Sequence, residues 1–359
     1  MANSEVQNLD TLLHEIAQEQ GDNFIYDQAS IAREGEQGAF TVSGLAIKVL
    51  TILGGLLGAS TFLGFLAATG LYDSPVSMVV VGALLFIGAE WLIHTNKEAM
   101  ADAVGVSLNI IGYLLLAIGV GQLTDSTSAV AGVLILVALL VMVFSESAIG
   151  VFLAVLVASG SFMTLILNHK VYNISHGLVI LLAVILTYMS LNEAKLIAAS
   201  PKLNKKYRPV RMGIIFSLVI TLAMFVHQKF LETTITHFWI PGLFLIGCLL
   251  FLMYKIMRDA AITRTKTQAV FCTCCILLLA PIIFTPSVPG ALLILLSSFY
   301  IGYKPGFWVG LLALVYFVIL YYYDLNMTLL AKSGVLVASG LLFLGGFVLL
   351  SKLLKSYAD

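Results

Sequence analysis

The sequence predicts an all-α fold, namely a polytopic integral membrane helical bundle of about twelve transmembrane helices. Of its 359 residues, 60% are hydrophobic and only 11% are charged, whereas a soluble domain has about a quarter charged residues. Long stretches also contain no Asp, Glu, Lys or Arg: Ala103–Thr124, Ser126–Ser145, Ser147–Asn168 and Val171–Asn192. A bilayer core of roughly 30 Å needs about 20 apolar residues per helix, so each stretch matches one crossing.

These stretches predict helices and not barrel strands. In lipid every backbone N–H and C=O group must be paired internally, which leaves helices and closed barrels. Barrel strands alternate apolar and polar residues over about ten positions. The uncharged stretches are about twice that length and apolar on all sides, which favours helices.

The chain begins with an acidic segment, residues 1–44, which we expect in the cytoplasm. It carries eight acidic residues and a single base, Arg33, so its net charge is −7. Ser4 and Gln7 have the spacing of a capping box, which starts a helix. The apolar residues Val6, Leu9 and Leu13 then fall on one face. We expect this amphipathic helix to dock on basic parts of the chain or on a partner, or to lie in solvent without a special role.

Residues 45–353 form the predicted bundle. The twelve expected spans are Leu45–Ala68, Val76–Ile93, Val104–Gln122, Ala129–Phe144, Ala148–Leu167, Ile174–Leu191, Met212–His227, Trp239–Ile256, Gln268–Phe284, Val288–Gly302, Phe307–Tyr323 and Met327–Leu350.

The ninth and tenth spans form an expected helical hairpin. The run Thr267–Tyr303 has no charged residue and is too long for one helix. Pro281, Pro286 and Pro289 lie in its middle, and proline cannot continue the helical hydrogen-bond ladder. The count is therefore twelve spans, with eleven as the alternative.

Lysine and arginine predict the orientation, because cytoplasmic loops are enriched in them. With both termini in the cytoplasm, sixteen of the 19 basic residues fall on the inner side, Lys170 and Lys229 fall outside, and Lys332 falls within a span. The sixteen are Arg33, Lys48, Lys97, Lys195, Lys202, Lys205, Lys206, Arg208, Arg211, Lys255, Arg258, Arg264, Lys266, Lys304, Lys352 and Lys355. A wrong span count would destroy this asymmetry.

The inner side also contains a central basic loop, residues 192–211, and a short tail, residues 354–359. The loop divides the spans into six and six. The formal net charge of the whole chain is zero, so we expect the lipid bilayer and not nucleic acid as the surrounding partner.

Small residues predict which helices pack closely. Gly105, Gly112 and Gly119 repeat every seven residues along the third span. Gly54 and Gly58 form a similar face in the first span. Small residues let membrane helices approach each other, so we expect these spans near the centre of the bundle.

The candidate functional site is a set of four polar residues: Asp324, Lys332, Tyr323 and Asn326. They flank the start of the last expected span, and ionisable groups inside lipid often mark functional sites. Lys332 could face a cavity or pair with a carboxylate. In the simpler reading, Asp324 or Asn326 caps the helix and Lys332 extends back to the headgroups.

Other polar groups predict no chemistry. Glu90, His94 and Glu98 share a helix face, which zinc or a proton relay would use, but we expect a solvated helix end. The cluster Cys272–Cys275 has a single Cys-x-x-Cys spacing and lacks the paired motifs of a metal site. His176 lies in no distinctive motif. We therefore predict no catalytic residue, no metal, no cofactor and no enzymatic activity.

The C-terminal part of the chain resembles a known family. The residues that carry the resemblance are Pro289-Gly290, Tyr321-Tyr322-Tyr323-x-Leu325 and Leu329-Leu330-x-Lys332-Ser333, together with Leu108–Gly112. They resemble an uncharacterised family of bacterial inner-membrane proteins, a domain of unknown function often encoded beside a smaller protein with a GDYXXLXY motif. Ala331 departs from the family, where an acidic residue often precedes the lysine. The resemblance implies a bacterial cytoplasmic (inner) membrane and a small GDYXXLXY-motif membrane protein as partner.

Two functions remain open. Twelve spans with inner termini and a central basic loop match the plan of many secondary carriers, so the first is a transporter. The alternative is a membrane scaffold or assembly partner of a small envelope protein, which needs few buried charges and many packing glycines. The loop His94–Ala101 lacks the Asp-Arg signature of the major facilitators, which argues against that superfamily.

Overall fold

The computed structural model describes residues 60–95, 99–228, 235–259 and 279–324, with isolated positions at 54, 57, 58, 268, 271–273, 275, 276, 334, 337, 340, 341, 344 and 345. Across these residues the regular elements are helices. The acidic segment 1–44, the tail 354–359 and parts of three expected spans lie outside the described residues. These spans are Leu45–Ala68, Gln268–Phe284 and Met327–Leu350.

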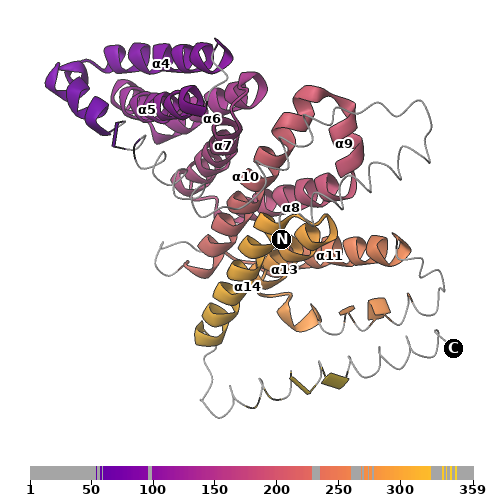
Figure 1. Cartoon of the computed structure of the whole chain (residues 1–359). Helices are drawn as coiled ribbons and strands as arrows, with labels where there is room; N and C mark the ends of the chain where they lie inside the picture. Colours follow the sequence, from indigo (N-terminus) through magenta and orange to yellow (C-terminus); the bar gives the residue numbers. More distant parts are fainter. Residues whose placement is uncertain are drawn as a thin grey trace, which may run out of the picture. The chain divides into compact units, whose positions relative to one another are not determined.

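Figure 1 shows the helices in chain order. The elements are η2 (Leu71–Asp73), α4 (Pro75–Thr95), α5 (Ala99–Thr124), α6 (Thr127–Phe144), α7 (Ala148–Asn168), η3 (Tyr172–Ile174), α8 (Ser175–Leu191), α9 (Glu193–Ala199), α10 (Pro201–Val226), α11 (Trp239–Asp259), η4 (Ala280–Ile282), α13 (Ser287–Tyr300) and α14 (Lys304–Asp324).

Eight helices in the described part of the chain are long and apolar enough to cross a membrane: α4, α5, α6, α7, α8, α10, α11 and α14. Each overlaps one expected span. The tenth expected span is also a helix, α13, but it has only 14 residues and so measures about 21 Å at 1.5 Å per residue. The protein is a multi-pass membrane protein with an all-helical bundle.

Serine residues start two of these helices as their sequence suggests. The side chain of Ser126 accepts a hydrogen bond from the amide of Ala129 at the start of α6. Ser147 does the same for Gly150 at the start of α7. These caps satisfy amide groups that have no partner within the helix, and they keep the connection between α6 and α7 to a few residues.

The turn before α13 agrees with the expected hairpin. Residues Ala280–Ile282 form the 3-10 helix η4, and α13 begins at Ser287, directly after Pro286. Pro289 lies in the first turn of α13, where a helix tolerates proline because its N–H would have no partner.

The segment 192–211, expected as a basic loop, is helical over almost all of its length. It comprises α9 and the first part of α10, which starts at Pro201 and continues through Pro209. Composition placed the helix start at Met212 because charged residues end the apolar run there. The helix instead extends further, because its inward face buries Tyr207 and Arg211.

Arg211 joins three elements near this end of the bundle. Its side chain is 2% exposed, and its guanidinium donates to Glu193 Oε1 at 3.1 Å. The guanidinium carbon lies 3.9 Å from the centre of the Tyr303 ring and 5.0 Å from that of Tyr207. The Tyr207 hydroxyl in turn donates to the carbonyl of Met189 at 2.8 Å.

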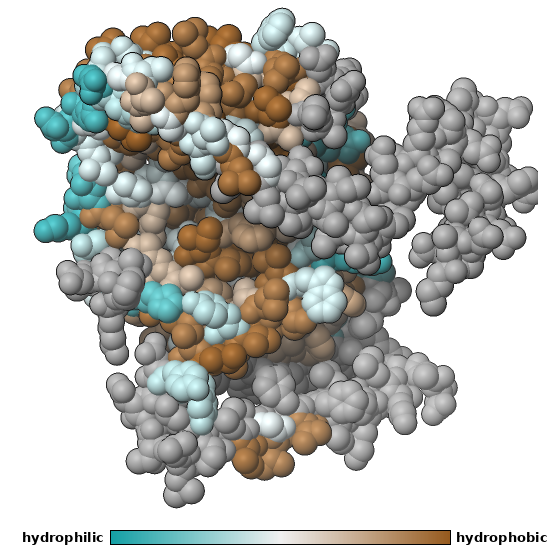
Figure 2. Space-filling view, turned by 60° about the vertical axis from the view of Figure 1, so that its left-hand side comes forward, coloured by the Kyte–Doolittle hydropathy of each residue, from teal (hydrophilic) through white to brown (hydrophobic). Residues whose placement is uncertain are grey.

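The described outer surface of the bundle exposes many large apolar side chains. On α4, Leu84, Ile87 and Trp91 are each more than half exposed, while Gly82, Phe86 and Ala89 on the opposite face are buried. Figure 2 shows hydrophobic residues spread over much of the face on view. Lipid is the solvent that such a surface matches.

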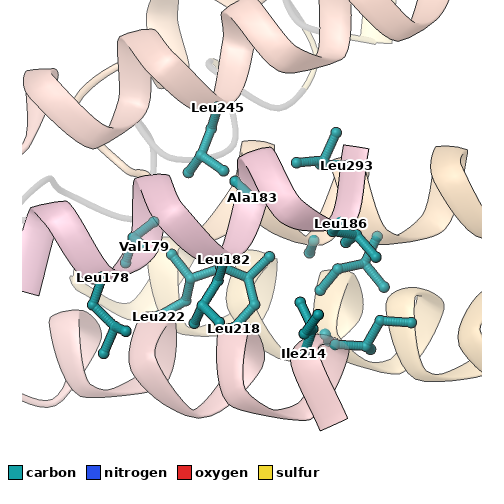
Figure 3. Packing of buried hydrophobic residues seen from close by; sticks show 14 of the residues in the cluster. Leu178, Val179, Leu182, Ala183, Leu186, Ile214, Leu218, Leu222, Leu245 and Leu293 are labelled. Atoms are coloured by element: carbon teal, nitrogen blue, oxygen red, sulfur yellow. The ribbon is translucent and has the colours of Figure 1, made fainter. Parts of the chain in front are cut away.

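The main core lies where α8, α10, α11 and α13 meet. Figure 3 shows Leu182 and Leu186 of α8 beside Leu218 and Leu222 of α10, with Leu293 of α13 close by. These side chains are almost completely buried. Close packing of this kind holds membrane helices together, because lipid supplies no hydrophobic driving force between them.

The predicted glycine face of α5 packs against α4. A Cβ atom at Gly112 would lie 2.8 Å from Cε2 of Phe86, and one at Gly119 would lie 2.9 Å from Cγ2 of Val79. At Gly105 the nearest atom would be Cγ1 of Ile93 at 2.5 Å. The expectation that these glycines mediate close helix packing is confirmed.

Hydrogen bonds sort the helix ends into two sets. At one end, which we call the basic end, Lys206 of α10 donates to the carbonyl of Met142 in α6 at 3.0 Å, and Tyr300 of α13 donates to Asp259 of α11 at 2.6 Å. At the other end, which we call the opposite end, Asn168 of α7 donates to Ser128 of α6 at 2.9 Å. Together with the short connections between consecutive helices and the contact of Arg211 with Tyr303, these bonds place one terminus of each helix among α4–α8, α10, α11, α13 and α14 in each set.

The α4–α5 contact gives a first prediction. Gly112→Leu places a large side chain against Phe86, so we expect a loss of about 1–3 kcal/mol of stability from overpacking. The measurement is the thermal unfolding midpoint in detergent. Gly132→Leu is the matched control, since a Cβ there meets no atom within 4 Å; equal midpoints for the two variants contradict the packing role.

The clamp at Arg211 gives a second prediction. Arg211→Lys keeps the charge but removes the planar group that stacks on Tyr303 and pairs with Glu193. We expect a loss of about 2 kcal/mol, the size of a desolvated cation–π contact, read from the same midpoints. The control, Arg208→Lys, changes an exposed arginine on the same helix and should have no effect. A wild-type midpoint for Arg211→Lys would show that charge alone suffices.

Candidate functional site

The structure describes the backbone of two of the four predicted site residues, Tyr323 and Asp324. Tyr323 lies in the last turn of α14 with 74% of its surface exposed, and Asp324 is the final residue of that helix. Asn326 and Lys332 lie outside the described residues. The role of Lys332 therefore remains a prediction.

A pocket of about 400 Å³ lies one turn before this segment, at the opposite end of the bundle. It is formed by the end of α10, the start of α11, the turn before α13 and the last part of α14. Its lining residues are Phe225, Val226, Gln228, Phe238, Phe284, Thr285, Pro286, Ser287, Phe317 and Tyr321. The pocket thus joins Tyr321 to the Pro286–Ser287 turn, close to the two parts of the C-terminal block that carry the family resemblance.

The pocket lining is neutral and rich in aromatic rings. Four phenylalanines supply apolar surface, and Gln228, Thr285, Ser287 and Tyr321 supply uncharged polar groups. The volume lies within the roughly 300–1,000 Å³ typical of small-molecule sites, which are mostly apolar with a few placed polar groups. The arrangement fits an uncharged, partly apolar ligand.

Gln228, which lines the pocket, makes two hydrogen bonds through its side chain. Its side-chain amide donates to the carbonyl of Phe225 at 2.9 Å, and its carbonyl oxygen accepts from the amide of Ile235 at 3.2 Å. This ties the end of α10 to the start of α11.

His176 contacts the pocket residues Phe225 and Phe238 on the side away from the pocket lining. Its Nε2 is 2.6 Å from the carbonyl oxygen of Thr236, so this nitrogen must carry the hydrogen. The ring stands edge-on to Phe225, with centroids 5.5 Å apart, and to Phe238 at 6.5 Å. His176 therefore positions pocket residues.

Below the pocket, toward the basic end, the bundle is tightly packed. Leu222 and Leu293 are completely buried, and Gly290 lies so close to Leu222 that a Cβ at this position would overlap its side chain. Pro289-Gly290, a dipeptide of the family resemblance, thus lies just after the pocket-lining residues Pro286 and Ser287, and a side chain at Gly290 would require Leu222 to shift.

A second group of polar residues lies near the basic end. Glu90 of α4 was expected at a solvated helix end, but this expectation is wrong. Its carboxylate accepts from Nδ2 of the buried Asn109 at 3.4 Å and from the hydroxyl of Ser145. His94, one turn further along, is exposed and pairs with Glu146 at 3.4 Å, as expected of a helix end.

Sequence reasoning underrated this group because Asn109 lies within an uncharged run. An amide in the middle of an apolar stretch was the available signal, since polar groups in lipid need partners. Glu90, Asn109 and Ser145 come from three separate elements, so their proximity depends on the fold.

The cysteines form no site in the described part of the chain. Cys248, Cys272 and Cys275 form no disulfide in the described part of the chain, and no cluster of three His, Cys, Asp or Glu side chains suited to a metal ion occurs there. Cys274 and Glu98 lie outside the described residues.

Comparison with known proteins identifies the family. The model of a domain of unknown function, DUF4401, matches residues 44–353, which is most of the chain. No curated protein and no solved structure matches. The chain therefore belongs to the DUF4401 family of domains of unknown function.

Proposed function

We propose that this protein is a transporter-like protein of the bacterial inner membrane that takes up an uncharged, partly apolar solute in the pocket at its outer end. The proposal has three parts: the orientation in the membrane, the number of crossings, and the use of the pocket. It includes no catalytic step.

The orientation is supported by where the basic residues lie. Every described lysine and arginine except Lys170 lies at the basic end of the bundle. Examples are Lys195, Arg208, Lys255 and Lys304, which come from four different helices. Positive residues are enriched on the cytoplasmic side, so the basic end faces the cytoplasm and the pocket faces outward.

Twelve crossings are supported by the directions of α11 and α13. Both helices have their C-terminal ends at the basic end, as the contact between Asp259 and Tyr300 shows. A further crossing between them, at the expected span Gln268–Phe284, accounts for these two directions. With the spans expected before α4 and after α14, both termini lie inside.

The pocket is the single observation that carries the transport proposal. It lies at one end of α10, α11, α13 and α14, and the same helices close the other end through buried leucines and the Arg211 clamp. A carrier in its outward-facing state has this form, with a site open to one side and a packed barrier on the other.

One experiment tests whether the barrier opens. In a variant whose native cysteines are replaced, Thr285→Cys places a thiol on the partly exposed wall of the pocket. A membrane-impermeant maleimide should label it from the outer side, in spheroplasts. If the protein is a carrier, the maleimide should also label this cysteine from the inner side, in inside-out vesicles, but more slowly.

The matched control is Thr164→Cys, on the surface of α7 outside the pocket lining. It faces lipid, where a thiol stays un-ionised and unreactive, so neither side should label it. Labelling of Thr285→Cys from the outer side alone contradicts transport and supports the second candidate.

That second candidate is an assembly partner. The specific observation for it is that the pocket lies at the helix ends, where a second membrane protein can insert an apolar or aromatic side chain. A small protein with a GDYXXLXY motif, which carries two tyrosines and a leucine, has suitable chemistry. Its stoichiometric co-purification, lost in Phe317→Ala, would support this function.

Fusion reporters check the orientation separately. We expect green fluorescent protein fused after Asp359 to fluoresce and alkaline phosphatase at the same position to be inactive. Insertion of alkaline phosphatase after Lys170 should instead give an active enzyme, because this loop lies at the opposite end. The reverse pattern would place the pocket in the cytoplasm.

A further inference from the structure

Glu90 is a carboxylate within the membrane-spanning part of α4, where the cost of placing a charge in lipid must be compensated by a partner or a function. Charged side chains inside lipid are costly, and they commonly mark ion pathways. Glu90 is only partly exposed, and its oxygens take hydrogen bonds from Asn109 and Ser145. Both partners donate, which is the pattern of an ionised carboxylate.

The α4–α5 register brings a further hydroxyl to this carboxylate. The two helices are antiparallel, so Phe86, one turn before Glu90, meets Tyr113, one turn after Asn109; the two rings pack edge to face at 4.8 Å. Side chains on a helix lean toward its N-terminus. The Tyr113 ring therefore leans toward the level of Glu90, and the carboxylate charge acts on its hydroxyl.

Two buried oxygen atoms in this group have no hydrogen-bond partner among the described residues. They are Oδ1 of Asn109 and the hydroxyl of Tyr113. Asn109 is 1% exposed and Tyr113 is 8% exposed, so bulk water does not satisfy them. A buried polar atom without a partner is costly, and each instance calls for an explanation such as an ion or water.

The charges around the group favour a single positive ion. Glu90 supplies one negative charge, and Asp102 of α5 adds to the negative potential. Lys206 of α10 opposes it, although its ammonium group also donates to carbonyls of α6. At the surface, His94 forms an exposed pair with Glu146, the residue after Ser145, which adds another carboxylate near this group.

We infer that Glu90, Asn109, Tyr113 and Ser145 form a site for a monovalent metal cation of the size of sodium. The ligands are all oxygens, as hard cations require: a carboxylate, an amide oxygen and two hydroxyls. One carboxylate neutralises one charge, so the set does not suit a divalent ion. It contains no sulfur or imidazole, so it does not suit zinc.

The site deepens the proposed function, because it would hold the coupling ion of a carrier. The sodium site and the transport function can still be refuted independently of each other. Sodium binding is measured on purified protein without transport, and the accessibility of Thr285→Cys is measured without regard to sodium.

The test is sodium-dependent stability of the full chain in detergent. Sodium chloride should raise the thermal unfolding midpoint saturably relative to choline chloride at equal ionic strength, since a ligand that binds the folded state stabilises it. Radiolabelled sodium should bind the same preparation. Glu90→Gln should abolish both effects, and Asp125→Asn, an exposed carboxylate at the opposite end, should change neither.

Two further variants keep the test decisive if Glu90→Gln misfolds. Tyr113→Phe removes only the unpaired hydroxyl, so it should raise the half-maximal sodium concentration severalfold without lowering the midpoint in choline. Lys206→Gln removes the opposing charge and keeps a hydrogen-bond donor, so it should lower that concentration. No difference between sodium and choline, a response to pH alone, or unchanged sodium dependence in Glu90→Gln would overturn the site.

Discussion

The whole structure depends on one constraint, which is that a chain in lipid must satisfy its own backbone hydrogen bonds. This constraint turns each apolar stretch into a helix of fixed minimum length. Because each helix enters at one side and leaves at the other, helix ends can gather in only two places. The basic end and the pocket end are the consequence, and the contacts of Lys206, Arg211 and Asp259 lie at the first, whereas those of Asn168 and His176 lie at the second.

Within the bilayer, packing quality replaces the hydrophobic effect. The α4–α5 pair shows how this works, because Gly105, Gly112 and Gly119 bring the two backbones close enough for Phe86 to meet Tyr113. The same close approach fixes the register that brings Glu90 to Asn109. The glycine contacts between α4 and α5 therefore also determine which polar side chains meet. For this reason, glycine spacing in a membrane helix can predict where a polar group finds its partner.

The uncharged runs of the sequence predicted much of this fold. Eight expected spans coincide with long apolar helices, and the hairpin turn at Pro286 was foreseen from its prolines. The sequence did not predict where a helix ends outside the lipid, because the apolar run shows only the part within the bilayer. The start of α10, predicted at Met212 and observed at Pro201, is the example. Arg211 looked like a loop cation, and its burial between Tyr207 and Tyr303 depends on partners almost a hundred residues apart in the chain.

The sites were harder to foresee than the spans. Tyr321 belongs to a tyrosine run that drew attention, yet the pocket it lines owes its shape to phenylalanines of three other segments. Phenylalanine in an apolar run carries no distinguishing signal. Glu90 was noticed for its spacing with His94, and its true partner, Asn109, lies on another helix.

A cryo-electron microscopy map of the protein in a lipid nanodisc tests the central claim most directly. The account predicts that the pocket around Tyr321 lies at one membrane surface and that the Glu90 group and Arg211 lie toward the other. A map with the pocket and Glu90 in the same leaflet, or with α11 and α13 running in opposite directions, would contradict it.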